Sequence, residues 1–236
     1  MGLFVLLSVF AICVVIGMPV AFAIGVAAVS AFAFEGLPVM IAFQRIISGI
    51  SIFSLMAIPF FIFAGELMFH GGIAIRLVRF ASSAVGAMRG GLGVVNVFSS
   101  MLFGGISGSA IADVSALGSI LIPVMKEKGY DDDYSVNVTV TSSIAGIIIP
   151  PSHNMIIYAV AAGGSLSISK LFLAGFVPGV LMCLCLAAVS YFVAVKRGYA
   201  SEVFPGFVTL FKDFITALPG LMTAIIIVGG VLSGIF

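Results

Sequence analysis

The chemistry that this sequence can do is concentrated in two short polar stretches of a hydrophobic chain. The first, GGISGSAIADVSALGS at residues 104–119, combines small residues, hydroxyl groups and the carboxylate of Asp113. The second, IIIPPSHN at residues 147–154, places two prolines directly before a Ser-His-Asn triplet. Hydroxyl and carbonyl oxygens are ligands for hard cations, and free backbone N–H groups at a helix start are ligands for anions. The two stretches therefore favour a site for a small cation, with sodium the natural candidate, beside a site for an anionic ligand.

The composition shows where these stretches must lie. The 236-residue chain is 62% hydrophobic and 8% charged, and its apolar runs approach or exceed the length that spans a bilayer. The sequence therefore predicts an all-α integral membrane protein whose first partner is the lipid bilayer. The net charge of +1 and the absence of a basic patch exclude a nucleic-acid partner.

The N-terminal apolar run is too long to cross the membrane once. Leu3 to Phe34 as a single helix would measure about 48 Å at 1.5 Å per residue, against a hydrocarbon core of about 30 Å. Gly17 and Pro19 mark the place where we expect the chain to kink or turn back. Further on, Arg76, Arg79 and Arg89 lie among apolar residues, which is typical of a helix in the membrane interface.

Residues 94–124 are predicted to form a re-entrant hairpin with the first polar stretch at its tip. Arg89 precedes the segment and Lys126 and Lys128 follow it, so the positive-inside rule puts both ends in the cytoplasm. Irregular backbone at membrane depth is tolerated only where protein buries it or a cavity hydrates it. The tip is therefore expected to line a binding site.

Residues 131–163 are predicted to form a broken transmembrane helix. Pro150 and Pro151 donate no backbone hydrogen bond and disfavour helical backbone before them. The break frees carbonyl oxygens on one side and N–H groups on the other, which are ligands for a cation and for an anion. We expect a second half-helix from Met155 to Ala162, with Asn154 as its cap.

These segments give the expected domain organisation of a secondary transporter. Its parts are scaffold helices (1–70), an interfacial arm helix (71–91), a transport core containing the hairpin and the broken helix (92–163), and a returning span with the start of a second scaffold (164–236).

Four ordered motifs carry a resemblance that covers Leu3 to Phe236. IPFFIFAGELM, GGISGSAIADVSALGSILIP, GIIIPPSHNMIIYA and SISKLFLAGFVPGVL are similar to the large membrane subunit of tripartite ATP-independent periplasmic (TRAP) transporters, the DctM family. The resemblance implies that this chain is half of an elevator-type transporter. This half would be one of two inverted repeats, and it would contain one re-entrant helical hairpin and one broken transmembrane helix. The family subunit is about twice as long, so the second inverted repeat is missing from this chain.

The resemblance also implies a function, partners and a location. The expected function is sodium-coupled import of an organic acid delivered by a periplasmic binding protein, with a small TRAP membrane subunit as partner, in the bacterial inner membrane as a multi-pass protein. One sodium ion is expected between the hairpin tip and the helix break, held by Ser107, Ser109, Gly146, Ile149 and Pro151. Na⁺ is the coupling ion, and no organic cofactor is expected.

The substrate is expected to contact Asp113, Ser152, His153 and Asn154. The half-helix start after Pro151 favours a carboxylate, so a sugar acid, a keto acid or a C4-dicarboxylate would fit. A structural role is the alternative for Asp113, whose carboxylate would cap the second hairpin arm or bond local hydroxyls such as that of Ser109. A satisfied buried side chain is the alternative for His153.

Two other functions remain open at this point. One is a non-transporting half-subunit or scaffold, which the short chain length allows. The other is an intramembrane serine protease, because Gly105 to Gly108 has the G-x-S-G form of rhomboid proteases and His153 would be the base for Ser107. The other elements of the rhomboid pattern are missing, which counts against the protease.

Overall fold

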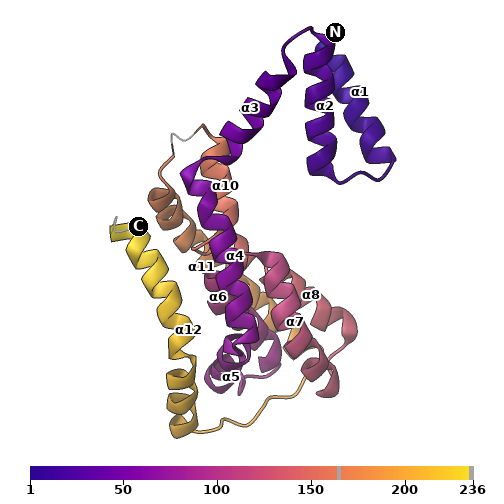
Figure 1. Cartoon of the computed structure of the whole chain (residues 1–236). Coiled ribbons are helices and arrows are strands. Elements are labelled where there is room, and N and C mark those ends of the chain that lie inside the picture. Colours follow the sequence, from indigo (N-terminus) through magenta and orange to yellow (C-terminus); the bar gives the residue numbers. More distant parts are fainter. Residues whose placement is uncertain (164–165, 234–236) are drawn as a thin grey trace. The chain divides into compact units, whose positions relative to one another are not determined.

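The computed structural model describes residues 1–163 and 166–233, apart from the side chains of residues 53, 54 and 232. The described chain consists of twelve helices and one isolated β-bridge, and it divides into two compact units, Met1–Met56 and Ala57–Phe236 (Figure 1). The predicted all-α class is confirmed for these residues. Each unit is described by itself below.

The first unit is built around a hairpin of two apolar helices. Its helices are α1 (Gly2–Val15), α2 (Val20–Phe34) and α3 (Val39–Ile50). Gly17 has a φ of 86°, a left-handed conformation that glycine adopts without steric cost, and the chain reverses there as predicted. The Gly2 N–H donates to Glu35 Oε1 at 2.6 Å, which joins the start of α1 to the end of α2.

The second unit is organised around one buried helix. Its first helices are α4 (Phe53–His70, in this unit from Ala57), α5 (Ile73–Val85), α6 (Gly91–Ser107) and α7 (Ala110–Glu127). Helix α5 is amphipathic: Leu77 and Ala81 are fully buried, whereas Arg76 and Arg79 are exposed. Helix α6 is buried along most of its length and separates two hydrophobic clusters, one shared with α5, α7 and α12 and the other with α7, α8, α9 and α11.

The predicted break in the segment after α7 is confirmed. The segment forms α8 (Asp132–Ser142), α9 (Ala145–Ile148) and α10 (His153–Ala161). The direction of the helix axis changes by 52° between the parts before and after the prolines. Two details differ from expectation. The helix is also interrupted at residues 143–144, between α8 and α9. Ser152 occupies the N-cap position of α10, so the prediction of Asn154 as the cap is wrong.

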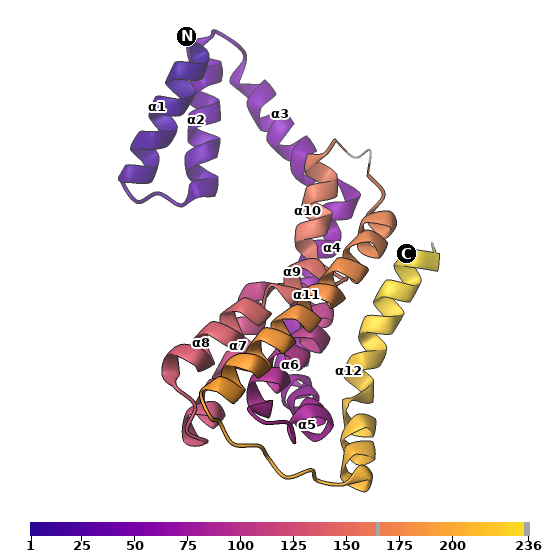
Figure 2. The same cartoon turned by 180° about the vertical axis from the view of Figure 1, so that it is seen from behind.

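Two long helices complete the described chain. They are α11 (Ile168–Lys196) and α12 (Phe207–Ser233). Figure 2 shows α11 running alongside α9 and α10 and on toward α8, while the chain between α11 and α12 is extended. Residues 164–165 and 234–236 of the expected returning span and second scaffold lie outside the described residues.

Length and composition qualify two described helices as membrane spans by themselves. These are Ile168–Lys196 and the Phe207–Val231 part of α12. The number rises to four if each of two broken pairs counts as one span, namely Val39–Ile50 with Leu55–His70 and Asp132–Ile148 with His153–Ala161. The described helices are thus consistent with a membrane protein.

Candidate functional site

The hairpin tip is a link of two residues between α6 and α7. Gly108 ends α6 with a φ of 62°, and its N–H donates to the Gly104 carbonyl at 2.9 Å. Ser109 begins α7 as its N-cap, and its hydroxyl accepts a hydrogen bond from the Ala112 N–H at 3.4 Å. The small residues of the opening motif therefore make a tight turn with little side-chain bulk, as a close approach to another segment requires.

The helix break leaves backbone carbonyls without their usual donors. In a continuous helix, the residues at 150 and 151 would donate to the carbonyls of Gly146 and Ile147, and proline has no N–H to donate. The Ser152 hydroxyl instead donates to the Ile147 carbonyl at 2.6 Å. In the described part of the chain, no comparable side-chain donor reaches the Gly146 carbonyl, so its oxygen would be available to a ligand.

The backbones of the tip and the break are in direct contact. A Cβ atom built on Gly104 would lie 2.7 Å from the Gly146 nitrogen, and one built on Gly108 would lie 2.7 Å from the Pro151 oxygen. Real Cβ atoms do not come this close to other heavy atoms. From the other side, a Cβ built on Gly146 would lie 3.2 Å from the Ser109 oxygen. The structure therefore brings the two polar stretches together.

The five predicted sodium ligands lie at this contact. Ser107 is 2% exposed, and its hydroxyl reaches the Ser109 carbonyl only at 3.4 Å, a long hydrogen bond. Gly146, Ile149 and Pro151 are also buried. All five residues offer neutral oxygen atoms, the donor type that suits a hard cation. Their role as ligands stays a prediction.

A hollow of about 350 Å³ opens beside the tip, between α4, the hairpin and the start of α10. Its apolar wall includes Ile62, Phe69 and Phe103. Its polar lining is Glu66, Ser107, Ser109, Ser115 and His153. The His153 Nδ1 atom is buried and has no hydrogen-bond partner among the described groups, which counts against the structural alternative of a satisfied histidine.

Among the predicted substrate residues, only His153 lines this hollow. Ser152 is fully buried and its hydroxyl is engaged by the Ile147 carbonyl. Asn154 is exposed and is not part of the lining. Asp113 is fully buried in the interior. Of the structural alternative for Asp113, the capping form is wrong, because Ser109 is the N-cap of α7 and accepts from the Ala112 N–H. A structural bond to a local hydroxyl stays an alternative.

A buried polar network, which the sequence reasoning missed, joins α6 to α8. The Asn96 Nδ2 atom donates to the Thr139 hydroxyl at 2.6 Å, and the Ser142 hydroxyl donates to Asn96 Oδ1 at 3.2 Å. The Ser100 and Ser142 hydroxyls lie 3.0 Å apart. Asn96 and Ser100 are four residues apart, and this spacing puts both polar side chains on one face of a helix. The spacing could have indicated from the sequence that this face contacts another polar helix. The network fixes the first hairpin arm to the broken helix.

Charged and aromatic groups at the far end of the hairpin form a cluster that we call the clasp. It consists of Lys128, Asp131, Asp133, Arg197, Tyr199 and Glu202. Arg197 Nη1 lies 2.8 Å from Asp131 Oδ2 and 2.9 Å from Asp133 Oδ1, and the Tyr199 hydroxyl donates to Asp131 at 2.7 Å. The Tyr199 and Arg197 groups lower the pKa of Asp131.

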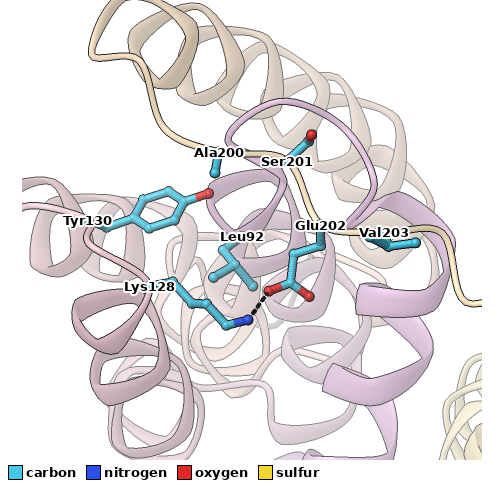
Figure 3. Close-up of a pocket in the computed structure, with 7 residues that line it drawn as sticks. All are labelled: Leu92, Lys128, Tyr130, Ala200, Ser201, Glu202 and Val203. Carbon is cyan, nitrogen blue, oxygen red and sulfur yellow. Dashed lines mark ion pairs between the residues drawn. The ribbon is translucent and has the colours of Figure 1, made fainter.

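The clasp also borders a second hollow, of about 420 Å³. Figure 3 shows Lys128 and Glu202 pointing toward each other, with their charged atoms 3.0 Å apart, beside Leu92 and Tyr130. The chain that follows α11 is thereby fastened to the turn between α7 and α8.

With this geometry established, the comparison with known proteins decides the family. Residues 7–236 match the family model described as "Tripartite ATP-independent periplasmic transporter, DctM component". The chain belongs to the DctM family. The recognition made from the four sequence motifs is thus confirmed.

Three relatives show how much of a DctM-family protein this chain represents. It is 40% identical over its whole length to the sialic acid TRAP transporter permease protein SiaT of Haemophilus influenzae, of which it covers 38%. It is 42% identical over 93% of its length to the large permease protein SiaM of Vibrio cholerae, covering 51% of it. It is 36% identical over 93% of its length to the C4-dicarboxylate large permease protein DctM of Rhodobacter capsulatus, covering 53% of it. The chain therefore spans about half or less of these relatives.

The family assignment also argues against the alternative that this chain is an intramembrane serine protease. DctM-family relatives are transporter permeases and not enzymes. The geometry agrees, because the Ser107 hydroxyl donates to the Ser109 carbonyl and no hydrogen bond to His153 is formed in the described part of the chain.

Proposed function

We propose that this chain is the first half of the large membrane subunit of a sodium-coupled transporter that imports an organic acid. In the whole protein, a second inverted repeat would complete the site. A periplasmic binding protein would deliver the acid, and a small membrane subunit would assist the large one in the bacterial inner membrane. The observation that carries this proposal is the direct contact between the hairpin tip and the helix break.

Sodium coupling is supported by the donor set at that contact. The Ser107 hydroxyl and the carbonyls near Gly146 and Pro151 are neutral oxygen atoms, and the proline break has removed the usual donor to Gly146. A desolvated Na⁺ ion takes such ligands without adding a buried fixed charge. Because the ligands come from two elements, ion binding would hold the tip against the break.

An organic acid is supported by the helix starts beside the hollow. Helix α7 begins after Ser109 and α10 begins after Ser152, and the start of a helix presents N–H groups and a partial positive charge to an anion. His153 adds a polar side chain to the same hollow. The named substrates of the relatives, sialic acid and C4-dicarboxylates, are organic acids and fall among the three kinds that we expect.

The location of the positive charges supports a hairpin that enters and leaves the membrane on the cytoplasmic side. Arg89 forms a β-bridge with Ser201, and Lys128 pairs with Glu202 in the same stretch of chain. Both ends of the hairpin therefore lie together at one end of the unit. Helix α6, with 17 residues, is about 26 Å long, which falls short of a full crossing.

Uptake in reconstituted vesicles tests the proposed function. The full-length subunit with its small membrane subunit and binding protein is placed in proteoliposomes, and accumulation of labelled organic acids is measured with an inward sodium gradient. We expect uptake that requires the gradient and stops when choline replaces sodium. Equal uptake in choline would contradict sodium coupling, and no uptake of any acid by a correctly folded complex would favour the non-transporting scaffold.

A further inference from the structure

The least satisfied charged group in the described structure is the carboxylate of Asp113. This side chain is fully buried, and neither of its oxygens has a hydrogen-bond partner among the described groups. Three other aspartates of the unit have partners: Asp131 and Asp133 bind Arg197, and Asp213 accepts from the Ser83 hydroxyl. Asp113 is therefore an exception that packing alone does not explain.

An isolated buried carboxylate is unfavourable in its charged form. Removing a carboxylate from water without a counter-charge carries a large desolvation cost, and it is larger still within a membrane. No described lysine, arginine or histidine forms an ion pair with Asp113. Its place in the first turn of α7 offers only the partial positive charge of the helix start. A bound cation would supply the missing counter-charge.

The surroundings of Asp113 are rich in neutral oxygen atoms. The Ser100 side chain of α6 approaches the carboxylate, and the Ser100 hydroxyl lies 3.0 Å from that of Ser142 on α8. Ser142 in turn donates to Asn96 Oδ1. Each of these four side chains is fully buried. A carboxylate and hydroxyl groups from three helices thus follow one another as buried neighbours, and carboxylate and hydroxyl oxygens are the donor types of a small hard cation.

We propose that Asp113 and Ser100 bind a second Na⁺ ion, separate from the one proposed between the hairpin tip and the helix break. This inference rests on the proposed sodium-coupled function and adds a second coupling ion to it. The ion would neutralise Asp113 and bind α6 to α7, so the loaded transport core would carry no unpaired charge through the membrane. Without the ion, the same carboxylate would oppose that movement.

Direct ion binding tests this inference without requiring transport. The full-length subunit in detergent is titrated with radioactive sodium, and the number of bound ions is compared between the wild type and Asp113→Asn, which keeps the side-chain shape. We expect the variant to bind one Na⁺ fewer than the wild type. Asp132→Asn, a change at an exposed carboxylate of α8, is the matched control and should leave the number unchanged.

Ser100→Ala is a second variant that tests the same site if Asp113→Asn does not fold. The serine variant should retain the number of sites and weaken one of them about tenfold, as expected for the loss of one hydrogen-bonding ligand to a charged group. An unchanged ion number in a folded Asp113→Asn variant, or unchanged affinities in Ser100→Ala, would overturn the inference and leave sodium coupling intact. Absence of sodium binding in the wild type would instead overturn the proposed function itself.

Discussion

Gly104 occupies a place where no side chain fits. A Cβ atom at this position would lie 2.7 Å from the Gly146 nitrogen and 2.8 Å from its Cα atom, and backbone atoms cannot swing aside as a flexible side chain can. We predict that Gly104→Ala destabilises the full-length subunit by about 1–3 kcal/mol, the usual cost of overpacking a core. Thermal unfolding in detergent measures the change.

Gly229→Ala is the matched control for that substitution. Gly229 lies inside α12, and nothing lies within 4 Å of a Cβ built there, so alanine should be neutral or slightly stabilising through its higher helix propensity. Equal unfolding temperatures for the two variants would show that the tip and the break are not in contact.

The two neighbouring polar residues of α10 should differ in their effect on transport. His153 lines the hollow with an unpaired Nδ1 atom, whereas Asn154 is exposed outside it. We predict that His153→Ala raises the KM for the acid about 2- to 10-fold, the effect of losing one hydrogen bond. Asn154→Ala should leave the KM unchanged. The reverse pattern in an uptake assay would place the acid on the other face of α10.

At the scale of elements, the helix break was predictable and its details were not. Two adjacent prolines interrupt a helix through local chemistry, so Pro150 and Pro151 located the break from the sequence. The start of α10 depends on which residue adopts extended backbone before it. Ser152 does so, while its hydroxyl bonds the Ile147 carbonyl, and this displaced the expected cap by two residues.

The clasp was not predictable because its members are far apart in the chain. Arg197 and Asp133 are separated by 64 residues, and only the packing of α11 beside the start of α8 brings them together. Charge counting from the sequence placed Lys128 of the clasp on the cytoplasmic side and did not pair it with Glu202. Ion pairs between distant segments need the tertiary structure first.

The clasp should loosen at low pH. Tyr199 and Arg197 lower the pKa of Asp131, so the stabilisation is present above the ordinary carboxylate pKa of about 4. It is lost as the pH falls through the lowered value. We predict that hydrogen-exchange protection factors of residues 197–203 in the full-length subunit stay constant from about pH 7 to pH 5 and fall below about pH 4.

Substitution of Arg197 should mimic acidification at neutral pH. Arg197→Gln should lower the protection of residues 197–203 about two- to fivefold, a small change because exposed ion pairs contribute little. Lys196→Gln is the control, since Lys196 is exposed and forms no ion pair in the described part of the chain. If the clasp has no structural role, the hydrogen-exchange protection of residues 197–203 will be identical in Arg197→Gln and Lys196→Gln.

At the scale of the whole molecule, the hairpin and the broken helix pack together as one body. The glycine contacts join the tip to the break, and the network of Asn96, Thr139 and Ser142 joins α6 to α8 further along. The sequence predicted each element of this body from its own pattern. It did not predict the network, because hydroxyl residues in a span are equally able to bond their own helix, as Thr139 also does with the Ser135 carbonyl.

An elevator movement predicts that distances within this body stay constant. Spin labels at Ser119 of α7 and Asn137 of α8, both exposed, should keep their separation when sodium and substrate are added to the full-length complex. A second pair, Gln44 of α3 and Asn137, should change its separation, because α3 belongs to the expected scaffold. Constant separation of both pairs under all conditions would contradict the elevator mechanism.

The sodium dependence of uptake by two serine variants tests the central claim most directly. Ser107 is buried at the contact between tip and break, whereas Ser115 is an exposed serine of the same hollow. We predict that Ser107→Ala raises the half-saturating sodium concentration about tenfold, since it removes one ligand from a charged ion. Ser115→Ala should match the wild type. Wild-type sodium dependence in Ser107→Ala would contradict a sodium site between the hairpin tip and the helix break.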